Sequence, residues 1–70
     1  MFWVWMDDSK LPVSDKITRA LAAYHGRFGT RPGVVLTHPE QLIIRADVLV
    51  LTGSERGAIV ARNVFWLGAS

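Results

Sequence analysis

The sequence predicts an α+β fold in which one main helix covers one face of a sheet of about four strands. Apolar segments of strand-like composition recur along the 70-residue chain. Only one stretch, about residues 15–28, has the three- and four-residue apolar spacing of an amphipathic helix. The expected element order is β-α-β-(short α)-β-β. Residues 1–70 are expected to form a single domain, because a chain of this length supports one core.

The first expected strand is the aromatic run from Phe2 to Met6. Aromatic and β-branched residues favour a pleated strand, and the alternation of side chains leaves apolar groups on both faces. A strand with two apolar faces is either central in its sheet or covered by another chain. A loop that contains Pro12 follows, since proline does not continue a strand.

The main helix is expected at about residues 15–28, with Ser14 or Asp15 as its N-cap. Lys16 and Arg27 fall mostly on the polar side of this helix. Gly29 is expected to end it, because glycine readily adopts the left-handed conformation found at helix C-termini. The apolar face combines residues at helical spacing, namely Ile17, Ala20, Leu21, Tyr24 and Phe28.

The second half of the chain is expected to supply the other strands. Pro32 presets the backbone of a turn, and Pro39 occupies the first position of a short helix. The remaining elements are expected in this order: a turn at 30–33, a strand at 34–37, a short helix at about 38–45, a strand at 47–52, a hairpin loop at 53–57 and a long strand at about 58–67.

The composition limits what can stabilise so short a chain. A core of this size supplies only about 3–5 kcal/mol unaided, and small domains usually add disulfides, a metal or a partner chain. Cysteine is absent, which excludes disulfides and thiolate metal sites. Half of the residues are hydrophobic, too many for a disordered segment. Oligomerisation is therefore the leading expected source of additional stability.

The sequence contains no recognisable targeting or membrane segment. The first apolar run is followed at once by Asp7 and Asp8. It is shorter than the apolar stretch of about 7–15 residues in a signal peptide or about 20 in a membrane span. We therefore expect a cytoplasmic protein with no membrane partner, and the absence of cysteine is compatible with that compartment.

The strands carry more apolar surface than one helix can cover. A contiguous apolar patch of this kind usually marks an interface. We expect a two-fold symmetric homodimer, formed by sheet faces or by edge strands. The alternative is that the three tryptophans all lie inside a monomer. The candidate interface residues are Phe2, Trp3, Trp5, Phe65 and Trp66.

Six of the eight cationic residues are arginines, and they are scattered along the chain. Nucleic-acid binding usually shows as a basic stripe or cluster. Folding could still gather Arg27, Arg31 and Arg56 into an anion or nucleic-acid site. Ordinary solvated arginines are the favoured interpretation, because a net charge of +2 gives little long-range attraction.

No catalytic or metal-binding pattern stands out, and we expect neither a cofactor nor a bound metal. His38 with Glu40 or Asp47 could act as a base and its orienting group, but helix capping also explains His38 and Glu40. No nucleophile accompanies them, so the sequence favours a protein that is not an enzyme. Asp7 and Asp8 are expected to be solvated loop carboxylates.

One segment resembles part of a family of small bacterial and mobile-element proteins of α+β fold. It runs from Tyr24 to Leu42 and combines an aromatic-glycine helix end, a proline turn, an apolar strand and a His-Pro step. The family pattern closes on an aromatic-Trp-Leu-Gly sequence, here 65–68. The resemblance implies a compact α+β unit and transfers no functional site.

Three hypotheses about function follow. The first is a self-associating protein-interaction module that forms a homodimer. The second is a nucleic-acid-binding dimer that uses scattered arginines together with exposed aromatic residues, on which bases can stack. The third is a small enzyme or ligand-binding protein with its site at the dimer seam.

Overall fold

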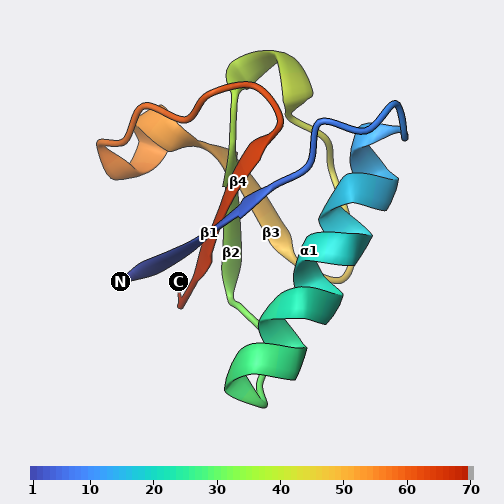
Figure 1. The fold of residues 1–70 in the computed structure, drawn as a ribbon. Coiled ribbons are helices and arrows are strands. Elements are labelled where there is room, and N and C mark those ends of the chain that lie inside the picture. Colours follow the sequence, from blue (N-terminus) through green and yellow to red (C-terminus); the bar gives the residue numbers. More distant parts are fainter. Residues whose placement is uncertain (70) are drawn as a thin grey trace.

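The computed structural model describes residues 1–69 and has an α+β fold, in which one α-helix lies against a four-stranded mixed sheet (Figure 1). The predicted fold class is confirmed. The short helix expected at 38–45 is only a 3-10 turn. The elements in chain order are β1 (Phe2–Met6), α1 (Val13–Phe28), β2 (Val34–Thr37), η1 (Pro39–Gln41), β3 (Leu49–Thr52), η2 (Gly53–Arg56) and β4 (Val64–Gly68), where η1 and η2 are 3-10 helices.

The last strand of the chain lies inside the sheet, and the first strand lies at its edge. The strand order is β1-β4-β2-β3. Strand β4 is antiparallel to both of its neighbours, whereas β2 and β3 are parallel. The apolar strand β1 is therefore not central in the sheet. Helix α1 of the same chain covers one of its two apolar faces.

Helix α1 begins earlier than expected and without a side-chain cap. Its N-cap residue is Pro12, and no side chain caps the helix, so the expectation of Ser14 or Asp15 as the cap is wrong. The Pro12 carbonyl accepts hydrogen bonds from the amides of Asp15 (3.0 Å) and Lys16 (3.1 Å). Proline suits this position because a helix start has no use for its missing amide. Gly29 ends the helix in the left-handed conformation, as predicted (φ 73°).

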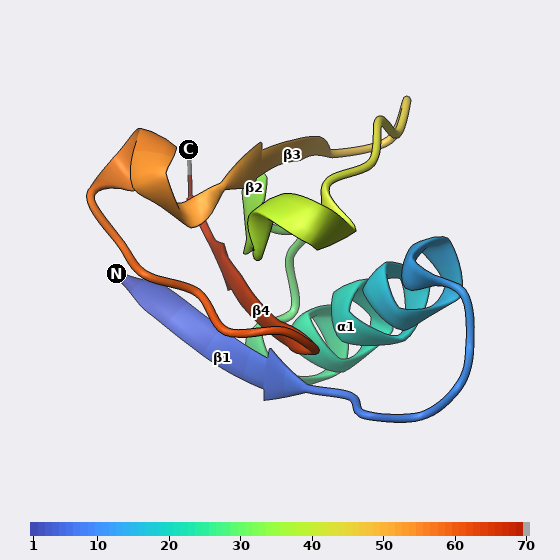
Figure 2. The same cartoon turned by 90° about the horizontal axis from the view of Figure 1, so that it is seen from above.

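Apolar side chains are buried on both faces of the sheet. Figure 2 shows α1 on one side and η2 on the other. Between α1 and the sheet the core contains Ile17, Ala20, Leu21, Val35, Val48, Phe65 and Leu67. On the opposite face Val34 and Leu36 are buried against Val60. The chain between η2 and β4 therefore covers part of the face that the sequence analysis expected to be free.

Strand β4 is shorter than predicted because the chain turns sharply just before it. Residues 58–63 are not part of the strand, and Asn63 has a positive φ of 62°. An asparagine tolerates this left-handed conformation better than most residues do. The segment also passes close to Gly53, where a Cβ atom would lie 2.6 Å from the Val60 Cγ2 atom. A glycine is therefore required for residues 58–60 to fold back over the sheet.

Within residues 1–69, none of the helices has the length and apolar character needed to cross a membrane.

Candidate interaction surface at the edge of the sheet

The five residues predicted to form an interface lie on two different faces of the sheet. Trp3 and Trp5 pair with Leu67 and Phe65 and share the face covered by α1. Phe65 has no exposed surface, so it belongs to the core and its assignment to an interface is corrected. Phe2 and Trp66 lie on the opposite face, where both are partly exposed, with their ring centroids 6.1 Å apart.

An aromatic cluster joins β1 to the last turns of α1. The ring centroid of Trp3 lies 5.9 Å from that of Trp5, 6.1 Å from that of Tyr24 and 5.8 Å from that of Phe28. Tyr24 and Phe28 are four residues apart on the helix, with their centroids separated by 4.6 Å. A shallow hollow of about 230 Å³ lies beside Trp3 and Phe28. The cluster thus extends the apolar surface from the helix out to the sheet edge.

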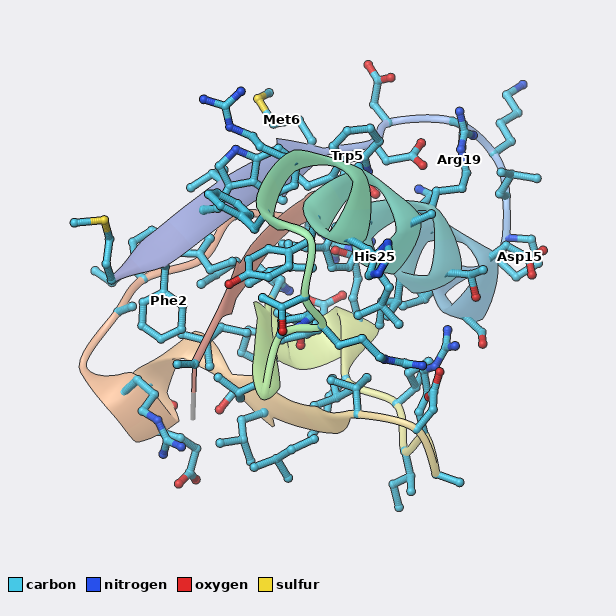
Figure 3. The ribbon with its side chains drawn as sticks, turned by 90° about the horizontal axis from the view of Figure 1, so that it is seen from below. Phe2, Trp5, Met6, Asp15, Arg19 and His25 are labelled. Carbon is cyan, nitrogen blue, oxygen red and sulfur yellow. The ribbon has the colours of Figure 1, made fainter. Side chains whose placement is uncertain are left out.

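The other face of β1 is apolar and open to solvent. Val4 is 47% exposed and Met6 is 75% exposed. Figure 3 shows Met6 at the outer margin of the strand and Phe2 on the side that faces η2. Sequence reasoning missed Val4 and Met6 because it favoured the large aromatic residues. The alternation of side chains along β1, which places both on the face of Phe2, was the signal that could have identified them.

The backbone of β1 has a free outer edge. The Asp7 amide donates to the Asn63 carbonyl at 2.9 Å, which makes this an inward-facing position. Backbone groups of an antiparallel strand alternate between its two sides. The backbone amides and carbonyls of Trp5 and Trp3 are therefore also directed toward β4. The amides and carbonyls of Phe2, Val4 and Met6 then point away from the sheet. The residues described here place no strand beside that edge.

Asp7 at the end of β1 is buried, contrary to the expectation of a solvated carboxylate, whereas Asp8 is exposed. The Ser9 amide donates to Asp7 Oδ1 at 3.1 Å, and Arg19 Nη1 lies 3.6 Å from Oδ2. The hydrogen bond from Ser9 lowers the pKa of Asp7, and the positive charges of Arg19 and Lys16 act in the same direction. This carboxylate therefore anchors the turn that leaves β1.

A buried polar network closes the same end of the sheet. Lys16 is 5% exposed, so the expectation that it lies on the polar side of the helix is wrong. Its Nζ donates to Asn63 Oδ1 at 2.8 Å, and Gln41 Nε2 donates to the same oxygen at 2.8 Å. The Asn63 amide donates in turn to Gln41 Oε1 at 2.6 Å. The burial of Lys16 is tolerated because its charge is hydrogen-bonded.

The structure does not gather the three arginines proposed as an anion or nucleic-acid site. Arg27 is in the last turn of α1, with its guanidinium 5.8 Å from the centroid of the Phe28 ring. Arg31 pairs with Asp47 at 3.4 Å. Arg56 belongs to η2, which lies far from the C-terminal end of α1 (Figure 1). Arg56 therefore lies apart from the other two candidate arginines.

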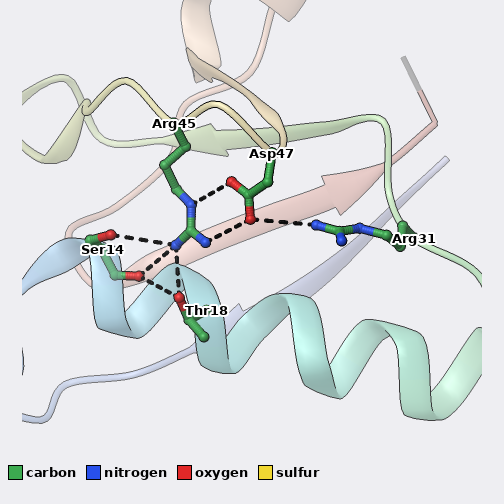
Figure 4. Close-up of polar contacts among 5 residues, drawn as sticks. All are labelled: Ser14, Thr18, Arg31, Arg45 and Asp47. Carbon is green, nitrogen blue, oxygen red and sulfur yellow. Dashed lines mark hydrogen bonds and ion pairs between the residues drawn. The ribbon is translucent and has the colours of Figure 1, made fainter.

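Asp47 pairs with an arginine, whereas the sequence analysis considered it as a partner of His38. Arg45 donates from Nε and Nη2 to the two carboxylate oxygens of Asp47, both at 2.8 Å (Figure 4). The Arg45 hydrogen bond lowers the pKa of Asp47 to about 2, although desolvation opposes this shift. Arg45 Nη1 also donates to the Ser14 carbonyl at 2.7 Å and to Thr18 Oγ1 at 2.8 Å. The cluster ties the loop before β3 to the start of α1.

The candidate catalytic pair has a capping geometry. His38 Nδ1 accepts a hydrogen bond from the Glu40 amide at 3.0 Å, at the start of η1. The Glu40 carboxylate instead pairs with Arg62. Among residues 1–69, no three histidine, aspartate or glutamate side chains are placed to hold a metal ion.

Comparisons of the chain with protein-family models, with curated proteins and with solved structures give no match. The resemblance to small bacterial α+β proteins therefore rests on the sequence pattern from Tyr24 to Leu42 and at 65–68 alone. Any proposal about function must be built from the geometry of the chain itself.

Proposed function

We propose that the protein is a small self-associating interaction module that forms a homodimer through the outer edge of β1. The observation that carries the proposal is the unprotected character of this edge. Natural sheets protect edge strands with charged side chains, proline, bulges or a covering segment. Phe2–Met6 contains no charged residue and no proline, and its register with β4 runs without a bulge.

Exposed apolar side chains flank the edge on both faces of the sheet. Val4 and Met6 lie on one face, and Phe28, which is 47% exposed, lies with Trp3 on the other. A chain that pairs with β1 would cover both sets at once. Burial of apolar surface is the main favourable contribution to association. It would add to the backbone hydrogen bonds that the edge can form.

A second copy fits this edge better than an unrelated partner. The strand is uncharged along its whole length, so two copies meet without electrostatic conflict, and an isologous contact closes after two chains. Strand β3, at the other edge, has only four residues. The loop that leads into β3 is also held against α1 by the hydrogen bonds of Arg45. We therefore assign the dimer contact to β1.

No comparable observation supports either of the two alternative functions. The nucleic-acid hypothesis relies on scattered arginines that contact phosphates, and Arg31 is already paired with Asp47. The enzyme hypothesis required His38 to face an acidic partner, and its Nδ1 atom instead accepts the Glu40 amide. Self-association rests on the edge strand, independently of both.

Replacing Val4 with lysine is expected to convert the dimer to a monomer. The substitution places a charge at the centre of the edge, which is how natural proteins prevent strand pairing. Sedimentation equilibrium should give about twice the chain mass of 7.8 kDa for the unmodified protein and the chain mass for Val4→Lys. We expect the dissociation constant to rise by about 100-fold or more.

Ile44→Lys provides the matched control, since Ile44 is 99% exposed but lies in the loop before β3. This variant should keep the dimer mass. An unmodified chain that stays monomeric at several hundred micromolar would contradict the proposal. A dimer lost in Ile44→Lys and kept in Val4→Lys would move the interface to the opposite edge.

A further inference from the structure

We infer that two copies pair antiparallel with their two-fold axis at Val4, so that Phe2 of each copy lies opposite Met6 of the other. This inference rests on the proposed function and specifies the geometry of the same edge. The two four-stranded sheets then form one continuous sheet. Both α1 helices lie on the same face of it, because a two-fold axis perpendicular to a sheet keeps each face on its own side.

The hydrogen bonds of β1 restrict the possible registers. Its outward backbone groups belong to Phe2, Val4 and Met6, as the bond from the Asp7 amide to the Asn63 carbonyl requires. The Val64 amide agrees with this assignment, because it donates to the Ala61 carbonyl at 3.2 Å. Outward groups must face outward groups in the second copy. The axis therefore passes through a residue of the strand and not between two residues.

Three axis positions satisfy that condition near the middle of the strand, and they use the edge differently. With the axis at Val4, all three outward residues pair within Phe2–Met6. With the axis at Trp5, Phe2 would lie opposite the charged and exposed Asp8. With the axis at Trp3, Met6 would find no partner within the strand. Only the Val4 register pairs every outward residue of β1 with another residue of β1.

The same register matches the side chains on both faces. On the face opposite α1, Val4 meets its own copy, and the exposed Met6 is covered by Phe2 of the other chain. On the helix face, Trp3 lies opposite Trp5 of the second copy at a position without direct backbone hydrogen bonds. Cross-strand side chains approach most closely at such positions. The Trp3–Trp5 contact within each chain thus continues across the axis.

The acidic end of β1 also favours antiparallel over parallel pairing. Asp7 and Asp8 follow the strand directly. In a parallel pair the carboxylates of the two copies would lie side by side, and like charges directly opposite each other destabilise a sheet. In the antiparallel pair they lie at opposite ends of the interface. The charge distribution therefore agrees with the hydrogen-bond pattern.

Single cysteines test the register directly, because the chain contains no cysteine of its own. Paired residues with backbone hydrogen bonds have Cα atoms about 5.5 Å apart, within the range of a disulfide. Under mild oxidation, Val4→Cys should therefore cross-link to itself. A mixture of Phe2→Cys and Met6→Cys chains should form the mixed dimer. Neither of these two variants should form a disulfide with a second copy of itself. In such a dimer the two identical cysteines would be offset by four residues along the strands, which is about 13 Å.

Val4→Pro gives an independent test of the hydrogen bonds. The hydrogen-bond pattern of β1 directs the Val4 amide outward, so proline is tolerated at this edge position. The variant should keep the circular dichroism spectrum of the folded protein. Its dissociation constant should rise by about 10–100-fold, because two central hydrogen bonds of the interface are lost.

The outcomes separate this inference from the proposal beneath it. A monomeric unmodified chain would defeat the proposed function itself. A stable dimer that Val4→Lys disrupts, but in which Val4→Cys does not cross-link, would keep the β1 edge and overturn the Val4 axis. Cross-linking of Val4→Cys with Met6→Cys would place the axis at Trp5 and would also overturn it.

Discussion

Phe65→Ala is expected to unfold most of the protein at 25 °C. Phe65 has no exposed surface and belongs to the core between α1 and the sheet. Its strand, β4, is hydrogen-bonded on both sides, which gives the cavity little freedom to collapse. Truncation of a buried phenylalanine costs about 3–5 kcal/mol. A chain this small has only about 3–5 kcal/mol from its core, so the loss is comparable to the whole stability.

Phe28→Ala is the matched control for Phe65→Ala. It removes the same atoms from a side chain that is 47% exposed. It should therefore cost less than Phe65→Ala, although it also removes apolar surface beside the β1 edge. Urea unfolding followed by circular dichroism, at one protein concentration for all variants, measures both changes. If Phe65→Ala unfolds at nearly the same urea concentration as the unmodified chain, the core described here is wrong.

Asn63→Ala is expected to lower the free energy of unfolding by about 2–4 kcal/mol. The substitution removes the oxygen that accepts from Lys16 and from Gln41. The ammonium group of the buried Lys16 is then left without that partner. Alanine is also disfavoured at the positive φ of 62°. The two effects act at one position, so their sum is large for a single polar residue.

Two further variants separate the contributions at Asn63. Asn63→Gly keeps the backbone conformation but loses the side chain, so its stability should lie between those of the unmodified chain and Asn63→Ala. Lys16→Met removes the buried charge itself, and it should cost less than Asn63→Ala because no unpaired charge remains. Chemical denaturation ranks the three. A stability of Asn63→Ala equal to that of the unmodified protein would show that the network contributes nothing.

Local sequence patterns were sufficient to predict most of the elements. Spacing along α1 identified Ile17, Ala20 and Leu21, and all three are buried under the helix. Gly29 marked the helix end through its conformational preference. The composition of Phe2–Met6 identified a strand with two apolar faces. Each of these inferences depends on neighbours within a few residues, which is the range over which sequence patterns are informative.

Features that depend on distant residues could not be predicted in the same way. Lys16 can be buried because its ammonium group donates a hydrogen bond to Asn63, which is 47 residues away in the sequence. Strand β4 starts late because the chain reverses at Asn63. A single asparagine in the run from Ala58 to Leu67 is a weak turn signal, and the apolar residues on both sides of it favour a strand. Phe65 and Trp66 lie on opposite faces of the sheet, and predicting which of the two is fully buried required knowing which face α1 covers. The predicted interface residues therefore included one, Phe65, that the fold places in the core.

Hydrogen exchange at the Val4 amide of the unmodified chain tests the central claim most directly. The Trp3 and Trp5 amides face β4 and should be protected at every concentration, whereas the Val4 amide is protected only if a second copy pairs with the outer edge of β1. We expect its exchange to slow as the protein concentration rises through the dissociation constant. A Val4 amide that exchanges at the unprotected rate in a sample of dimer mass would contradict pairing at this edge.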